Sequence, residues 1–162
     1  MKRRVLTFFL VMTAMVSSAD SLTVRSLFQS MPDSLLPYLS RNNRLDFIDF
    51  IDSKMKAEVV NELGGTSEMT ALTDDSLSIR LNAVSKVDML LLSTTTQERT
   101  IVLIRTLGRE NDLTESDVEY FTVQWQPITD KPTFDQTSQK RLDVIVRRLN
   151  ILNRYIKILN KD

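Results

Sequence analysis

The chain has 162 residues, enough for one domain, and its 21 basic and 21 acidic residues give no net charge. It contains no cysteine and no histidine, which excludes disulfides, thiolate and Ser-His-Asp catalysis, and histidine-ligated metal centres. We therefore expect no cofactor. Because the Lys and Arg residues form no dense basic run, we also expect no nucleic-acid partner.

The first 19 residues have the three-part pattern of a secretory signal peptide. Residues 2–4 are basic, residues 5–16 are almost entirely apolar, and small residues lead up to Ala19. We expect cleavage between Ala19 and Asp20. The apolar run is too short for a permanent membrane span. The alternatives are an uncleaved anchor and a buried N-terminal helix. The exported protein is then expected in the periplasm or on the cell surface, and without a cysteine it is not a lipoprotein.

The part of the mature chain from residue 22 to residue 65 is predicted to be helical. Short helices are expected before and after Pro32. A longer helix is expected from Arg44 to about Leu63, with Gly64 as its stop signal. Its apolar residues recur at three- and four-residue spacing and share one stripe: Leu45, Ile48, Ile51, Met55 and Val59.

Residues 67–126 change to a two-residue period, which predicts a sheet. Four strands are expected, at 76–81, 86–93, 99–107 and 118–126, and the short polar gaps between them favour hairpins. Such strands form an antiparallel meander. With the N-terminal helices packed on it, residues 20–162 are predicted to be a single α+β domain.

The C-terminal part is predicted to contain a helix at 136–149. Apolar residues continue at helical spacing beyond it, but Asn150 and Asn153 lie where a helix would break. Residues 150–160 are therefore left open between further helix and a strand.

Three stretches resemble an uncharacterised family of exported Bacteroidetes proteins, a domain of unknown function. They are MPDSLLPYLSRNNRLDFIDFIDSKMKAEVVNELGG (Met31–Gly65), the TSEMTALTDDSLSIRL that follows it, and FTVQWQPI (Phe121–Ile128). The resemblance spans roughly residues 24–128. It implies an exported location, no established activity and no catalytic residues to transfer. It also implies that related chains continue beyond Asp162, which leaves open whether this chain is a shortened member with an incomplete last sheet edge.

Five acidic residues are the candidates for a metal site. Asp46, Asp49 and Asp52 recur every three residues on the predicted helix, and Asp74 and Asp75 follow in a turn. Clustered carboxylates suit Ca²⁺. The favoured interpretation is a solvated helix face, because no EF-hand spacing is present and acids are stabilised near a helix start.

Two serines are candidates for O-glycosylation. Asp-Ser-Leu occurs three times, and the sites within the predicted domain are Ser34 and Ser76. The motif is similar to the acceptor used in exported Bacteroidetes proteins, which requires an exposed hydroxyl. Asp33-Ser34 is equally typical of a helix cap.

Three aromatic residues near the end of the predicted sheet could form a platform for a sugar or peptide. Phe121 and Trp125 are expected on one face, and Tyr120 on the other. The favoured interpretation places Phe121 and Trp125 in the core and leaves Tyr120 exposed.

The sequence favours a non-catalytic binding or interaction module of the cell envelope, with a protein or peptide partner added to a sheet edge. The alternative is a carboxylate-based glycan hydrolase or a Ca-dependent glycan-binding protein. A cleft holding several of the acids at raised pKa would favour that alternative. The oligomeric state is not predicted.

Overall fold

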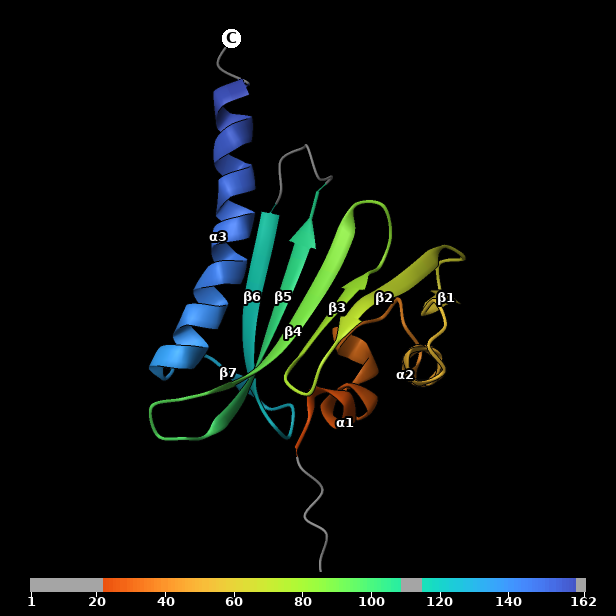
Figure 1. Ribbon diagram of the computed structural model, residues 1–162, viewed down its shortest axis with the longest axis horizontal. Coiled ribbons are helices and arrows are strands. Elements are labelled where there is room, and N and C mark those ends of the chain that lie inside the picture. The colour runs from red at the N-terminus through yellow and green to blue at the C-terminus, as the bar shows by residue number, and fades with distance from the viewer. Residues whose placement is uncertain (1–21, 109–114, 160–162) are drawn as a thin grey trace, which may run out of the picture.

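The computed structural model describes residues 22–108 and 115–159, with side chains as far as Arg147 (Figure 1). In these residues seven antiparallel strands form one sheet, and their order in the sheet follows the sequence. The strands are β1 (Glu58–Val60), β2 (Thr66–Leu72), β3 (Ser76–Arg80), β4 (Ser85–Ser93), β5 (Arg99–Leu107), β6 (Glu115–Thr122) and β7 (Pro127–Ile128). The helical elements are α1 (Val24–Gln29), the 3-10 helix η1 (Asp33–Leu35), α2 (Arg41–Asp52) and α3 (Gln136–Leu159).

The α+β class and the antiparallel meander are confirmed, but the predicted number of about four strands is wrong. Strands β1 and β7 have three and two residues, too few to show a two-residue period. Strand β2 is mostly polar, and a register shift between Met69 and Ala71 interrupts its alternation. The fourth predicted strand also begins earlier than expected, at Glu115, and ends at Thr122.

The predicted long helix ends at Asp52, eleven residues before the expected Leu63. Its last turn closes as a Schellman motif, in which the Met55 N–H donates to the Phe50 carbonyl at 2.8 Å and the Lys54 N–H donates to the Ile51 carbonyl at 3.0 Å. Lys54 takes the left-handed conformation that glycine usually supplies, with φ 56°. Gly64, expected as the stop, instead lies with φ 74° in the turn between β1 and β2. Met55 is therefore outside the helix and 57% exposed.

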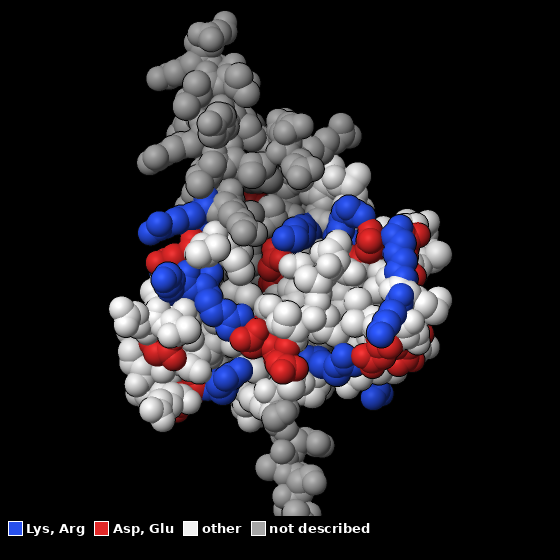
Figure 2. Space-filling model, in the orientation of Figure 1, with Lys and Arg blue, Asp and Glu red and all other residues white. Residues whose placement is uncertain are grey.

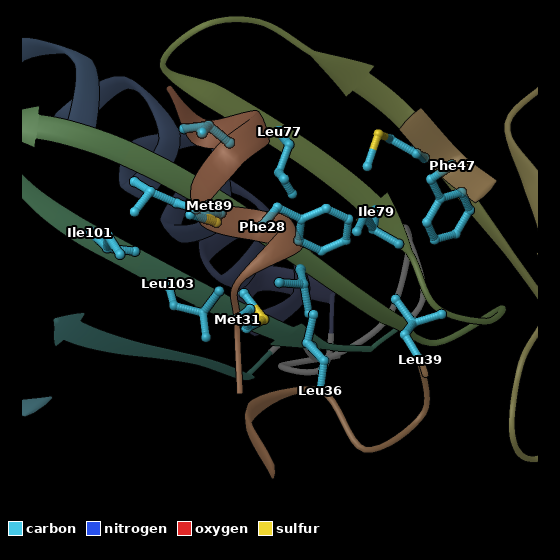
Figure 3. Close-up of a cluster of buried hydrophobic side chains, with 14 of the residues drawn as sticks. Phe28, Met31, Leu36, Leu39, Phe47, Leu77, Ile79, Met89, Ile101 and Leu103 are labelled. Atoms are coloured by element: carbon cyan, nitrogen blue, oxygen red, sulfur yellow. The ribbon is translucent and has the colours of Figure 1, made fainter. Parts of the chain in front are cut away.

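One face of the sheet is covered by α1, η1 and α2, which enclose the larger hydrophobic core (Figure 3). Alternate residues of β3, β4 and β5 point into it, because side chains of a strand alternate between faces. Phe28 and Phe47 pack on them from the helices. The core residues contributed by the three strands include Leu77, Ile79, Val87, Met89, Leu91, Ile101 and Leu103.

The other face is covered by α3 over the later strands only. Leu90, Leu92, Val102 and Ile104 pack there with Leu142 of α3 in a second, smaller core. Strands β4 and β5 are thus buried on both faces, which explains their nearly continuous apolar sequences.

Helix α3 is fastened at its start by polar contacts. The Asp135 carboxylate accepts the Ser138 N–H at 2.7 Å, and this hydrogen bond holds the pKa of Asp135 below its usual range. The Ser93 N–H donates to the Ser138 hydroxyl at 2.9 Å. The helix predicted at 136–149 is present, and the open question about the following residues is answered, because 150–159 continue as helix. None of the described helices is both long and apolar enough to cross a membrane.

Candidate functional site

The candidate acids on α2 do not come together with those of the later turn. Asp46 and Asp49 are exposed. The Asp52 carboxylate accepts hydrogen bonds from the two terminal guanidinium nitrogens of Arg25, at 2.7 and 2.8 Å, and these bonds lower the pKa of Asp52. No group of three acidic residues that could hold a metal ion occurs in the described part of the chain.

The two acids of the β2–β3 turn have structural roles. The Asp74 carbonyl accepts the Val24 N–H at 2.8 Å at the start of α1. The Asp75 carboxylate accepts a hydrogen bond from the guanidinium of Arg141 in α3 at 2.5 Å, and this contact lowers the pKa of Asp75. A catalytic acid or a shared carboxylate site requires the opposite shift, a raised pKa.

Acidic and basic side chains alternate over the face shown in Figure 2, and they form ion pairs rather than a patch of one sign. On the half of the sheet that α3 leaves open, Arg80 pairs with Glu68 and Lys86 with Asp88.

The two candidate glycosylation serines differ in exposure. Ser34 is exposed in η1. Ser76 is half-buried, pairs with Leu90 in the sheet, and its hydroxyl is 2.7 Å from the Thr73 hydroxyl. Only Ser34 therefore offers the exposure that modification requires. The expected cleavage site at Ala19 and Asp20 lies outside the described residues.

The three aromatic residues do not form one platform. Phe121 and Trp125 belong to the larger core, with ring centroids 5.7 Å apart, and the Trp125 indole donates to the Leu27 carbonyl at 3.2 Å. Tyr120 lies on the opposite face, 6.1 Å from the ring of Phe134. Tyr120 is half-buried rather than exposed, and its burial raises the pKa of the phenol.

The two edges of the sheet differ in how their backbone groups are satisfied. At the β1 edge the Asn43 side chain of α2 donates to the Val60 carbonyl at 3.2 Å, and the strand is only three residues long. Short strands and covering helices are how proteins close a sheet edge. The β1 edge is therefore protected.

Among the described residues, the β6 edge has no strand partner over most of its length. Strand β7 pairs only with Tyr120 and Phe121, and no strand of the described chain lies beside residues 115–119 on that side. The Thr122 N–H donates toward β7, to the Gln126 carbonyl at 2.9 Å. Because alternate residues of a strand direct their backbone groups to the same side, Ser116 and Val118 direct their N–H and C=O groups outward.

A groove of about 600 Å³ lies beside this edge, between β6, β7 and η1. Its apolar lining includes Leu35, Trp125 and Ile128, and its charged lining consists of Glu119 and Lys131. The sequence pattern does not predict this groove, because its walls come from segments about 90 residues apart. The acidic alternation of β6, at Glu115, Asp117 and Glu119, was the signal in the sequence that could have indicated an exposed edge.

Together these features define a small α+β domain with one protected and one open sheet edge in its described part. The chain belongs to the family described as "Protein of unknown function (DUF3256)", which matches residues 16–152. The predicted resemblance to an uncharacterised family of Bacteroidetes proteins is thereby confirmed.

A domain of an uncharacterised protein from Porphyromonas gingivalis W83 is among the solved structures with a similar fold. The two share 21% sequence identity with a TM-score of 0.54, over 65% of this chain and 52% of that one. The present chain thus spans about half the length of that solved domain, and the likeness concerns the fold alone. No curated protein matches this chain.

Proposed function

We propose that this chain is a non-catalytic binding module of the cell envelope that takes up an extended polypeptide segment as an additional strand along β6. The observation that supports this is the pair of outward-facing residues, Ser116 and Val118, at the open edge of the sheet. Extended peptides bind such edges through main-chain hydrogen bonds. The alternative of a Ca-dependent glycan-binding protein has no support from the described residues, which contain no group of three acidic residues able to hold a metal ion.

The main-chain contacts would support modest affinity by themselves. Two outward residues offer two N–H and two C=O groups, and a hydrogen bond contributes roughly 0.5–1.5 kcal/mol net. Immobilising the segment costs several kcal/mol. Side chains placed in the groove beside β6 would then supply the remaining affinity.

Replacing Ser116 by proline is expected to prevent capture of the segment while leaving the domain folded. Proline removes the outward N–H, and proline is tolerated in an edge strand where the N–H faces away from the ladder. A photo-crosslinking residue at the exposed position 117 should then mark a discrete partner segment in the host envelope, and Ser116→Pro should abolish that crosslink.

Ser116→Ala is the matched control, because it keeps the N–H and loses only the hydroxyl that lies 3.3 Å from Thr106. The crosslink should survive this change. A second crosslinker at Val60, on the protected edge, should mark no common segment. Equal crosslinking from both edges, or a crosslink insensitive to proline, would contradict the proposal.

The location in the envelope rests on the pattern of the first 19 residues. If the leader is removed, the intact mass of the protein isolated from its host should correspond to a chain beginning at Asp20. A mass that includes Met1 would show that the segment is retained and would contradict cleavage.

A further inference from the structure

We infer that the segment bound along β6 carries basic residues at alternate positions, with apolar residues between them. This inference rests on the proposed strand addition and specifies its partner. It follows from the different side chains that β6 presents on its two faces, because an added strand must place its own alternate side chains beside them.

One face of β6 is acidic along its open length. Glu115, Asp117 and Glu119 alternate, so they lie on the same face as Phe121. Among the described residues, Arg105 of β5 is the one cation that forms ion pairs with these acids. It contacts Glu119 and lies 3.8 Å from Asp117. The Asp117 side chain is 71% exposed. Even with Lys131, which lines the groove with Glu119, the described residues place three carboxylates against two cations where a new strand would lie.

The opposite face of β6 is largely apolar. Val118 and Tyr120 pack against the smaller core under α3 and are only partly buried. A neighbouring strand would extend this packing with the apolar residues of its alternation. The two faces thus require different chemistry at successive positions of the partner.

The groove beside the edge suits a long basic side chain. Leu35 and Trp125 line it together with the charged residues Glu119 and Lys131. Lys and Arg cover apolar surface with their aliphatic stems while the charged group reaches a polar partner. The groove could therefore hold the stem of a basic residue and bring its charge to Glu119.

A second copy of this chain is a poor occupant of the same edge. Pairing two β6 strands would place Glu115, Asp117 and Glu119 beside their counterparts, and like charges on neighbouring strands are destabilising. The acids thus also act against edge-to-edge association. Charge complementarity selects a basic partner.

Three capped peptides of about eight residues test the inference: alternating Lys-Val, alternating Glu-Val, and a block peptide with four Lys followed by four Val. Each is titrated into the ¹⁵N-labelled mature protein and followed by amide chemical shifts. The Lys-Val peptide should bind about tenfold more tightly than Glu-Val. It should shift the β6 amides and weaken with added salt. Neutralising the edge with Glu115→Gln and Asp117→Asn should remove most of that preference.

The possible results separate the two proposals. If both alternating peptides bind at β6 with equal affinity, the edge takes up strands without charge selection and only the present inference fails. If the block peptide binds as well as Lys-Val, the attraction is general electrostatics, and the alternation is wrong. If no peptide perturbs β6, or if Ser116→Pro leaves Lys-Val binding intact, strand addition itself fails.

Discussion

Replacing Ile48 by aspartate is expected to lower the free energy of unfolding by about 4 kcal/mol or more. Ile48 lies in α2 with 3% of its surface exposed, within the larger core beneath the sheet. A carboxylate at this position would lose its hydration without a partner and would also remove apolar contacts. The measurement is urea unfolding at neutral pH, and the variant should be largely unfolded if the domain has ordinary stability.

Met55→Asp is the control for this result. The sequence pattern placed Met55 on the same helical stripe as Ile48, but α2 ends at Asp52 and Met55 is 57% exposed. Its substitution should change the stability by about 0.5 kcal/mol or less. Equal losses at the two positions would show that the helix continues as the sequence pattern predicted.

Replacing Arg44 by methionine is expected to cost about 3 kcal/mol. The Arg44 side chain is 1% exposed and ties α2 to the segment between α1 and α2. Its guanidinium donates to the Leu39 carbonyl at 3.0 Å and to the Met31 carbonyl at 2.9 Å. Methionine fills a similar volume but leaves both buried acceptors without a donor. Thermal unfolding of the variant measures the loss.

The carboxylate partner of Arg44 provides the contrast. The Asp33 oxygen lies 2.6 Å from the guanidinium, but its side chain is 72% exposed. Water can replace much of this contact, so Asp33→Asn should cost about 1 kcal/mol or less. A larger loss at Asp33 than at Arg44 would show that the ion pair, rather than the buried carbonyl contacts, anchors the segment.

Arg44 also shows what a sequence pattern does not reveal. It was expected only as the first residue of a helix, where arginine is normally solvated. Its burial depends on two carbonyls, of Met31 and Leu39, that reach it because the chain turns twice before α2. No local rule indicates that these groups meet.

The sequence by itself determined the class of the domain and its most regular elements. Strand β5 has the predicted bounds, Arg99–Leu107, and the helix predicted at 136–149 lies within α3. In both, apolar spacing alone indicates which face is buried, because the period is long enough to be recognised. The absence of cysteine and histidine likewise limited the available chemistry without any coordinates.

Only the tertiary structure decided where α2 ends, how many strands pair and which edge stays open. Lys54 ends the helix in a left-handed backbone conformation that non-glycine residues disfavour. The hydrogen bonds between β1 and β2, which need the chain to leave the helix here, offset that cost. The β1 edge is protected by the contact of Asn43 with Val60 and by the shortness of β1, and the β6 edge is open because β7 is so short. The end of α2, the number of paired strands and the open edge all depend on hydrogen bonds between segments distant in the sequence. The free energies of those bonds depend on groups that meet only after the chain has folded.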